Sequence, residues 1–469
     1  MRGVVSCVKH GGSPEENVYS VVDADSGSCR TFKSTIVLKE GELAEFEPED
    51  GIIRTAAISF DEKIAKGVVD GAGASAKRHV KNKPYKHGQK GLDDATTKMW
   101  PKLSAAARLF IRKLLLGVPI MIRFHNDADG SSGAYAVYKA LEELGAKTGI
   151  GAAGNISWKM HRSVAYASDD ASGDYMLSNG YASIEKPLLL IIDFGTSVES
   201  NSGIDVVSKR FDIIWLDHHP LEKGFGGFSL EHYINPWQYG GDSNYTAGFL
   251  ACTFARTFSG VDVSDLAEAS FIGDYSEYSR PTESGRKLSM LLDLLTSDTS
   301  IVTGARDSNL SPEGINSVVI DGKRTEELLD YAKNKLDEAI AAALRSVKMQ
   351  KAGSARIFIV DFKDVRDDTS RYPLPGRFAS KLLDKVAELN PEPCVVVLHF
   401  NRFVSVRVDK KIADKTNLLG AIREMKDAYT NVDSGGGHMS AGTIKLSNDE
   451  NRNEIIRHFV NTMKRNLEA

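Results

Sequence analysis

Acidic and imidazole side chains follow three largely apolar segments of this sequence, at the point where each segment ends. The segments are short and uninterrupted, at 120–124, 188–192 and 213–216. The polar residues that come directly after them are His125, Asn126, Asp127, Asp129, Asp193, Asp217, His218 and His219. Carboxylate oxygens combined with one or two imidazoles form a mixed ligand set that suits Mn²⁺ or Mg²⁺. The residue types therefore predict metal-ion chemistry.

Short apolar runs of this kind are typical of strands that are buried on both faces of a parallel sheet. In open α/β sheets the carboxyl ends of such strands face the ligand crevice, so we expect these polar side chains at one rim. Carboxylates packed together repel one another and raise each other's pKa unless a cation lies among them. Either the three strand ends lie far apart in space, or they share metal ions.

The composition predicts a multi-domain protein without a membrane anchor. The chain has 469 residues, of which 42% are hydrophobic, enough for about three domains. Its longest uncharged apolar run, at 114–122, is about half the length needed to cross a bilayer, and the N-terminus lacks a signal-peptide core. Four cysteines without paired spacing argue against disulfides and against a structural zinc site. We therefore expect a cytoplasmic protein with no membrane contact.

The first 60 residues read as about five short strands separated by turns, which predicts a small β-barrel of OB-like type. Acidic side chains crowd into its second half, between positions 40 and 50. This charge favours protein docking or a purely structural role over nucleic-acid binding.

Residues 61–99 have a different character, which predicts a basic flexible linker. Positions 71–92 contain six Lys and Arg residues, no Asp or Glu, and no apolar periodicity. Such a linker either collects a phosphate backbone by releasing counterions or is only a solvated connection.

From residue 100 the pattern alternates between apolar runs and amphipathic segments, which is typical of the strand–helix units of a doubly wound parallel sheet. A long amphipathic helix at about 325–349 would join this lobe to a second, smaller α/β lobe. The predicted division is a β-barrel at 1–60, the linker at 61–99, a catalytic domain at 100–300, a helical connector at 301–351 and a substrate-binding domain at 352–469.

The ordered motifs resemble the DHH phosphoesterase superfamily, in its branch with a DHHA1 accessory domain, and within it the archaeal RecJ-like nucleases. They are Asp-x-Asp-Gly at 127–130, the lone Asp193, Asp-His-His at 217–219 and Gly-Gly-Gly-His at 435–438, within a match that covers about 100–469. One departure is that positions 125–129 read His-Asn-Asp-Ala-Asp instead of the bacterial Asp-His-Asp-Ala-Asp. Both ligand aspartates are kept, so the departure bears on the subfamily rather than on the chemistry.

The resemblance implies two divalent ions, Mn²⁺ or Mg²⁺, held by six residues. The implied ligands are Asp127, Asp129, Asp193, Asp217, His218 and Asp274. Asp193 and Asp217 would bridge the ions, and Glu277 is the alternative to Asp274. Catalysis would involve His219, His218 and Asp217, with His219 stabilising charge on the phosphate or protonating the leaving oxygen. His125 and Asn126 would be a ligand or outer partners.

The resemblance also implies that the C-terminal lobe grips the terminal nucleotide of the substrate. The implied contacts are Ser405, Arg407, Gly435, Gly436, Gly437 and His438. Successive glycines between a helix and a strand could direct backbone N–H groups into an anion-binding concavity, and the Arg407 guanidinium could form paired hydrogen bonds with a phosphate.

Three functions fit these features. The first is an exonuclease that releases mononucleotides from single-stranded DNA or RNA in replication or repair. The second is a DHH phosphoesterase for small substrates such as oligoribonucleotides, a 3′-phosphoadenosine nucleotide or cyclic dinucleotides. The third is an inactive scaffold bound to the replisome or a helicase. All six candidate ligands are Asp or His, which favours an enzyme, although a replisome or helicase partner and a homo-oligomer both stay open.

Overall fold

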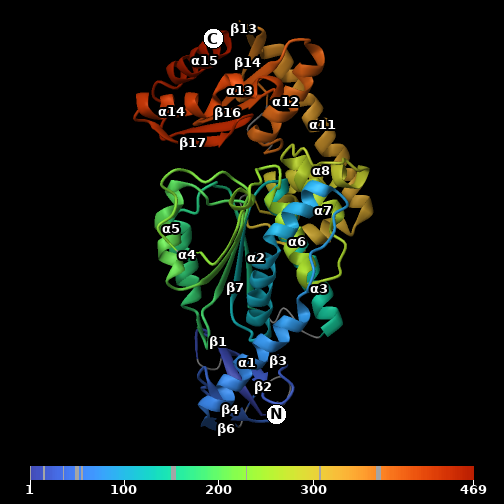
Figure 1. Cartoon of the computed structure of the whole chain (residues 1–469), viewed down its shortest axis with the longest axis vertical. Helices are drawn as coiled ribbons and strands as arrows, with labels where there is room; N and C mark the ends of the chain where they lie inside the picture. Colours follow the sequence, from blue (N-terminus) through green and yellow to red (C-terminus); the bar gives the residue numbers. More distant parts are fainter. Residues whose placement is uncertain are drawn as a thin grey trace. The chain divides into compact units, whose positions relative to one another are not determined.

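The computed structural model describes residues 2–13, 16–34, 36–47, 52–53, 56–148, 155–228, 230–305, 308–365 and 371–469. The chain forms two compact units (Figure 1). Unit 1 contains Met1–Leu292 and Thr299–Ile320, and unit 2 contains Asp293–Asp298 and Asp321–Ala469. These units do not test the boundaries of the finer five-part division, which stay a prediction.

The N-terminal strands of unit 1 form one curved sheet, consistent with the predicted OB-like barrel. Its strands are β1 (Arg2–Lys9), β2 (Val18–Asp23), β3 (Cys29–Ser34), β4 (Glu42–Glu45), β5 (Ile52–Ile53) and β6 (Ala57–Phe60). They run in the order β5-β3-β2-β1-β4-β6, and the later strand β9 (Tyr181–Ser183) also pairs with β1. The β1–β9 pairing attaches this sheet to the rest of unit 1.

A parallel five-stranded sheet, in the order β12-β11-β10-β7-β8, is the centre of unit 1. Its strands are β7 (Ile120–His125), β8 (Ile156–His161), β10 (Leu188–Ile192), β11 (Asp212–Leu216) and β12 (His232–Ile234). The predicted parallel α/β lobe is therefore confirmed. β10 is fully buried because its side chains alternate between two covered faces.

Helices cover both faces of this sheet (Figure 1). Leu189, Ile191 and Trp215 belong to a core shared with α4 (Ser168–Ser178) and α5 (Asn201–Ser208). The other face is covered by helices that follow or precede the strands in the chain. These are α2 (Lys90–Leu115), α3 (Ala128–Thr148) and α6 (Ala247–Phe258). The remaining helices that lie wholly or largely in unit 1 are α7 (Ser264–Gly273), α8 (Glu283–Ser297), α9 (Ser300–Thr303) and α10 (Pro312–Val319).

The prediction of a flexible linker at 61–99 is wrong. Helix α1 (Glu62–His79) begins at its N-cap Asp61, and α2 begins at residue 90 and continues through Pro101. Helix α1 packs on α2 through small buried side chains such as Ala72 and Ala76. Small residues allow close helix packing but produce no periodic apolar signal, so the sequence pattern did not indicate a helix.

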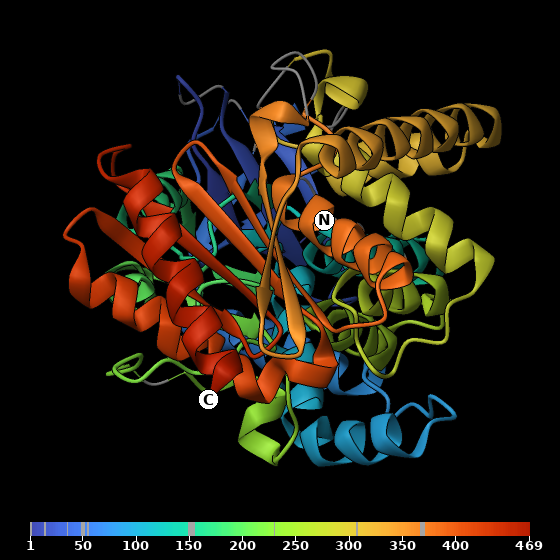
Figure 2. The same ribbon diagram turned by 90° about the horizontal axis from the view of Figure 1, so that it is seen from above.

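Unit 2 is the predicted smaller α/β lobe. Its sheet has the order β13-β14-β15-β16-β18-β17, and only β14 and β15 run parallel. The strands are β13 (Lys348–Ala352), β14 (Ala355–Asp361), β15 (Cys394–Phe400), β16 (Phe403–Val408), β17 (Val432–His438) and β18 (Ala441–Leu446). The helices are α11 (Gly322–Ser346), α12 (Pro375–Leu389), α13 (Ala413–Thr416), α14 (Leu418–Ala428) and α15 (Arg452–Glu468). Helix α12 packs on one face of the sheet, and α14 and α15 pack on the other (Figure 2).

The glycine segment at 435–437, which was predicted to connect a helix and a strand, is itself part of edge strand β17. Gly436 is paired with Thr443 of β18, and the hairpin continues to His438. A methyl group on Gly435 would lie 2.8 Å from the Ile422 side chain of α14. The glycines therefore permit a helix to lie directly on the strand, which is a packing role that sequence spacing does not reveal.

The predicted fold class is confirmed by these three sheets and by the long helix α11 before the last one. Among the described residues, no helix has the length and apolar character that a membrane crossing requires.

A buried ion pair links the central strand β7 to α4. Both Arg123 and Asp174 are almost fully buried, and the Arg123 Nε lies 3.0 Å from each Asp174 carboxylate oxygen. The hydroxyl of Tyr166 donates to the same carboxylate at 2.7 Å. Each charge is therefore paired and hydrogen-bonded, which is the condition under which buried ions are tolerated.

We expect Asp174→Ala to lower the free energy of unfolding of unit 1 by about 3–5 kcal/mol, because Arg123 would stay buried without a partner. Urea unfolding followed by tryptophan fluorescence measures this, since all four tryptophans lie in unit 1. The control Asp205→Ala removes an exposed pair with Lys209 and should change the free energy by less than about 1 kcal/mol. Equal effects of the two substitutions would contradict a structural role for the buried pair.

Candidate metal centre

The register of the parallel sheet brings the polar residues after its strands into one row. Ile192 of β10 is paired with Phe124 of β7 and with Leu216 of β11, so the next residue of each strand lies at the same level. The outer strands β8 and β12 continue the row in the same register. The residues in this row, in spatial order, are Asn235, Asp217, Asp193, His125 and His161. The expectation that the three strand ends meet at one rim is met.

The candidate ligands form two groups that share Asp193. In the first group, His125 Nδ1 lies 2.9 Å from Asp127 Oδ2 and 3.7 Å from Asp193 Oδ2. In the second, His218 Nε2 lies 3.4 Å from Asp193 Oδ1 and 3.2 Å from Asp274 Oδ2. The two oxygens of the Asp193 carboxylate therefore face different groups, as a carboxylate shared by two metal ions would.

Asp129 completes the second group. Its Oδ2 lies 3.6 Å from His218 Nε2, and its ligand oxygen lies within 4.8 Å of the ligand nitrogen of His218 and the ligand oxygen of Asp274. A further set of ligand atoms within 4.8 Å of one another connects the two groups and consists of Asp193, Asp217, His218 and His219.

Several ligand atoms in the cluster are buried without a hydrogen-bond partner. They are Asp193 Oδ2, Asp217 Oδ2 and His218 Nε2. A buried polar atom that is left unpaired costs about 1–3 kcal/mol. Divalent cations among these atoms would remove that penalty, so the donor set fits two ions bound by oxygen and nitrogen ligands.

The tautomer of His218 is set by a backbone carbonyl. His218 Nδ1 lies 2.7 Å from the carbonyl oxygen of Ser243, which can only accept a hydrogen bond. Nδ1 therefore carries a proton, and Nε2, which faces the carboxylates, is the nitrogen that would bind a metal once its own proton is displaced, as is usual for a metal-binding histidine. The His218 carbonyl is held in turn by Trp237 Nε1 at 3.1 Å and by the Ser243 hydroxyl at 2.9 Å.

Asp129 is bound by the amino terminus of α6. Its carboxylate accepts hydrogen bonds from the N–H groups of Ala247 at 2.9 Å and Gly248 at 2.7 Å, and from the Ser270 hydroxyl. Free N–H groups and the helix dipole stabilise an anion at this position. A methyl group on Gly248 would lie 2.7 Å from Asp129 Oδ1, so only glycine allows this approach.

Asp217 orients His219. One oxygen of Asp217 accepts hydrogen bonds from the backbone N–H groups of His218 and His219 and from His219 Nδ1, at 2.7, 3.2 and 2.8 Å. The His219 carbonyl accepts from Asn235 Nδ2 at 3.0 Å. The geometry favours Asp193 as the shared carboxylate, while a bridging role for Asp217 stays a prediction.

The backbone is strained at two points beside the cluster. Asp193 has a φ of 69° and Tyr275, which follows Asp274, has a φ of 54°. This left-handed conformation is unfavourable for residues other than glycine, by about 1–2 kcal/mol. Such strain is concentrated at functional sites, where the surrounding contacts hold it in place.

Burial and mutual repulsion dominate the electrostatics of the cluster. Burial, together with the neighbouring carboxylates, raises the pKa of Asp129 and of Asp193. For His125 and His218 burial acts in the opposite direction, but the surrounding carboxylates outweigh it and raise the pKa of both imidazoles well above the usual value. The ligands therefore retain protons that an arriving cation has to displace.

Sequence reasoning missed the residues that hold the ligands in place. Ser243, Gly248 and Asn235 lie in or beside the segment before α6, and Thr246 caps this helix by accepting from the Phe249 N–H. The signal that could have found them is the dense run of small and polar residues at 240–248 directly before an apolar helix.

None of the other predicted site residues belongs to the groups of ligand atoms found among the described residues. Glu277 is exposed, and its N–H donates to Asn244 Oδ1 at 2.9 Å. Asn126 is buried, and the structure assigns it no role. In unit 2, Arg407 Nε donates to the Ser380 hydroxyl at 2.8 Å and Nη1 to the Ser405 hydroxyl at 3.2 Å. The side chain of His438 lies outside the described part of the structure.

Comparison with known proteins identifies the fold. No protein-family model matches the chain. An uncharacterized protein of Methanocaldococcus jannaschii is 24% identical over 417 residues, which cover 78% of this chain and 54% of that protein. This chain thus spans about half the length of the curated relative.

Two solved structures are also similar. A DHH-domain structure, described as coming from a member of a family of ribosomal proteins, is 20% identical, with a TM-score of 0.70 over 87% of this chain and 99% of that one. A manganese-bound RecJ exonuclease is 15% identical, with a TM-score of 0.48 over 78% of this chain and 94% of that one. The first of these shows that the chain has the fold of a DHH-domain protein.

We expect Gly248→Ala to weaken Mn²⁺ binding by about 10–100-fold, the usual effect of disturbing an outer partner of a metal ligand. The added methyl group would push Asp129 away from the N–H groups of α6. Titration calorimetry of the full chain with Mn²⁺ measures the affinity. The control Gly173→Ala adds a methyl group to α4 where no atom lies within 4 Å, so it should bind Mn²⁺ as the wild type does. An unchanged affinity of Gly248→Ala would exclude the proposed role of α6.

We expect the affinity for Mn²⁺ to rise with pH. The pKa values of four ligands are raised, namely those of Asp129, Asp193, His125 and His218. Each of these side chains therefore keeps its proton to a higher pH, and below that pH the proton competes with the ion. The gain should continue above about pH 6.5, the ordinary pKa of histidine. Calorimetry in buffers of different ionisation enthalpy counts the released protons, and an affinity that is constant between about pH 6 and pH 8 would contradict this account.

Proposed function

We propose that this chain, which has the fold of DHH-domain proteins, is a metal-dependent phosphodiesterase that releases mononucleotides from one end of single-stranded DNA or RNA. The observation that carries the proposal is the position of Asp193, whose two carboxylate oxygens face two separate groups of ligands. Pairs of divalent ions that share a carboxylate are typical of enzymes that cleave phosphodiesters.

The two groups define which residues would hold each ion. His125, Asp127 and Asp193 would hold one, and a second set would hold the other, consisting of Asp129, Asp193, His218 and Asp274. Mn²⁺ or Mg²⁺ bound there would lower the pKa of a water molecule and neutralise the charge that develops on the phosphate. The carboxylates keep their positions because backbone N–H groups and the Ser270 hydroxyl hold Asp129, and because Asp127 Oδ1 accepts from the Gly130 N–H at 3.0 Å.

His219 is the residue that we assign to proton transfer. Its side chain is 39% exposed, and its Nδ1 is engaged by Asp217, so Nε2 is the nitrogen available to a substrate. Burial lowers the pKa of His219, but the Asp217 carboxylate outweighs it and raises the pKa above the usual value. A proton retained on Nε2 near neutral pH can be donated to the leaving oxygen or can stabilise charge on the phosphate.

Unit 2 is proposed to bind the substrate, as the resemblance to DHHA1 domains implies. Arg407 extends from β16 toward the start of α12, where Ser380 orients its guanidinium. A methyl group on Gly376 would lie 3.3 Å from Arg407 Nη2. The Arg407 guanidinium is preoriented by these contacts. Arg407, Ser405 and the glycine strand at 435–437 could together bind a phosphate. A role in DNA replication or repair, with a replisome or helicase partner, is part of the same proposal.

The proposal is tested with end-labelled single-stranded DNA and RNA incubated with the full chain and Mn²⁺. We expect a ladder of shortened products, and we expect Asp193→Ala to reduce the rate by more than about 100-fold, since the loss of an outer partner alone costs about 10–100-fold. The control Asp205→Ala, on the exposed side of α5, should keep the full rate.

The products separate the proposal from its alternatives. Cleavage confined to pieces of two to five nucleotides would instead indicate a phosphoesterase for small substrates. A wild-type chain that cleaves nothing with any divalent ion would refute hydrolysis and leave a scaffold.

A further inference from the structure

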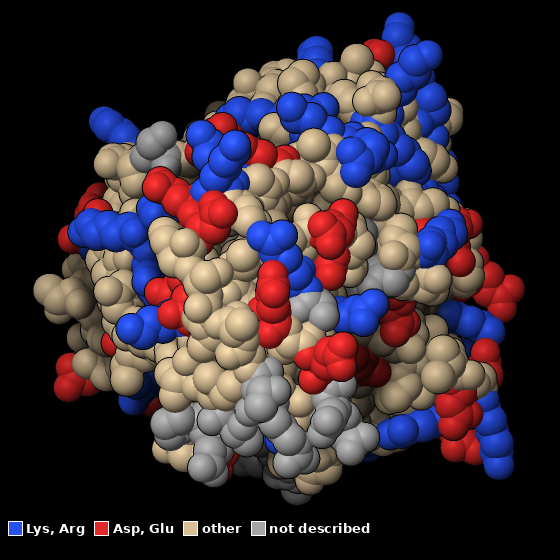
Figure 3. All heavy atoms as spheres, turned by 90° about the horizontal axis from the view of Figure 1, so that it is seen from below, with Lys and Arg blue, Asp and Glu red and all other residues tan. Residues whose placement is uncertain are grey.

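Unpaired cations are concentrated on one part of unit 1, outside the metal centre. Residues 71–92 contain six Lys and Arg residues and no acidic residue, in a chain whose formal net charge is −4. In the structure this segment comprises the end of α1, the connection to α2 and the first residues of α2. Lysine and arginine side chains gather along one margin of the face shown in Figure 3, which is viewed from below.

The connection between the two helices is anchored rather than free. The Lys81 N–H donates to the Thr257 carbonyl at 2.8 Å and its Nζ donates to the Ser259 carbonyl at 2.7 Å. Arg256 of α6 lies over the Tyr85 ring at 4.0 Å, and Gln89 Nε2 donates to the Tyr278 carbonyl at 3.0 Å. The backbone that carries the cations of this segment is therefore anchored to the rest of unit 1.

Some cations of α1 and α2 have carboxylate partners and others have none. Lys113 Nζ lies 3.0 Å from Glu185 Oε2 and 2.7 Å from Asp212 Oδ2, and Arg112 also pairs with Glu185. In contrast, no ion pair among the described residues involves the following side chains: Lys77, Arg78, Lys83, Lys86 and Arg108. The unpaired cations lie on exposed surface, where they are available to a partner.

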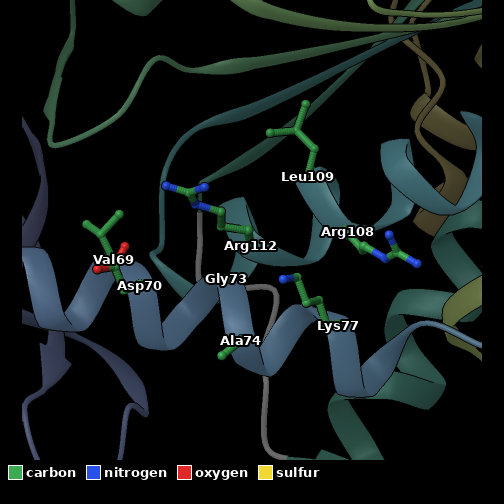
Figure 4. A pocket seen from close by; sticks show the side chains of 8 residues that line it. All are labelled: Val69, Asp70, Gly73, Ala74, Lys77, Arg108, Leu109 and Arg112. Atoms are coloured by element: carbon green, nitrogen blue, oxygen red, sulfur yellow. The ribbon is translucent and has the colours of Figure 1, made fainter.

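A groove between α1 and α2 contains two of these unpaired cations. It has a volume of about 400 Å³ and is lined by Lys77 from α1 and by Arg108 and Arg112 from α2 (Figure 4). Val69 and Leu109 contribute apolar walls, and Asp70 is the one acidic residue among its lining side chains.

The α1 side of the groove is open because it carries a glycine. A methyl group on Gly73 would meet no atom within 4 Å, and the same holds for Gly71. Glycine in a helix interior is less favourable than alanine. Packing within the described structure would allow a side chain at both positions, so it does not explain why they are glycine. An open backbone of this kind is found where a ligand approaches closely.

We propose that this groove binds the phosphate backbone of single-stranded nucleic acid at residues that are not metal ligands. The choice of ligand rests on the proposed function. Lys77 and Arg108 would contact phosphates, and the apolar walls would contact sugars or bases. Arg78, Lys83 and Lys86, which are exposed and have no ion pair among the described residues, follow in the same segment. Several cations in one segment favour a polyanion such as a nucleic-acid backbone over a short acidic protein segment.

The proposal is tested by fluorescence anisotropy with labelled single-stranded oligo-dT and oligo-U of about 20 nucleotides, binding the full chain in EDTA between 50 and 200 mM salt. For Lys77→Gln/Arg108→Gln we expect roughly fivefold weaker binding per charge removed at about 0.1 M salt. The slope of log affinity against log salt should become shallower by about 1.4, because each phosphate contact on a single strand contributes about 0.7.

Two further variants separate binding in the groove from changes in folding or net charge. Gly73→Leu should fill the groove and weaken binding, while the Tm stays equal or rises because leucine favours a helix. The control Lys209→Gln removes an exposed charge at the end of α5, elsewhere on unit 1, and should leave the slope unchanged.

The proposal would be overturned if the groove variants bound with wild-type affinity and slope, or if the control weakened binding equally. It would also be overturned if the wild-type chain showed no salt-dependent binding, which would point to an acidic protein as the partner. Because binding is measured without divalent ions, groove-dependent binding by a chain that hydrolyses nothing would refute only the nuclease. Hydrolysis with unchanged binding by the groove variants would refute only the groove.

Discussion

Repulsion among buried carboxylates is the constraint on which the rest of this structure depends. Asp129, Asp193 and Asp217 are almost fully excluded from water, and they lie together with three buried or half-buried imidazoles at one edge of a parallel sheet. Such a cluster is stable only if protons or cations lie between the acidic groups. The raised pKa values of Asp129 and Asp193 mean that these groups hold protons more readily than usual. Bound divalent ions would take the place of those protons.

Most contacts around the cluster serve to direct one particular atom at its centre. A backbone carbonyl fixes the proton of His218, the amino terminus of α6 holds Asp129, and Asp217 turns His219 so that Nε2 stays available. The first two of these partners come from segments outside the parallel sheet, and Asp217 directly follows β11. The sheet therefore brings the ligands together, while the surrounding loops and helix ends set their orientation and protonation.

The helices α1 and α2 belong to the same unit as the metal centre, although their sequence resembled that of a linker. Gln89 is hydrogen-bonded to Tyr278, which lies four residues after Asp274. The start of α2 is thus attached to the segment that follows the candidate ligand Asp274, within the same unit as the groove. A nucleic-acid strand held in the groove would be anchored to the same framework that positions the ligands, which would favour repeated cleavage over release.

The sequence alone determined the strands that end at the metal centre and the residue types placed there, because buried parallel strands are continuous apolar runs and the ligands follow them directly. It did not indicate α1, whose packing uses alanine and glycine, nor the glycine edge strand β17. Only the tertiary structure decided that Asp193 lies between the two ligand groups and that the Gly248 N–H donates a hydrogen bond to Asp129. The reason is physical: the first depends on the register between strands, and the second on a contact between residues 119 positions apart.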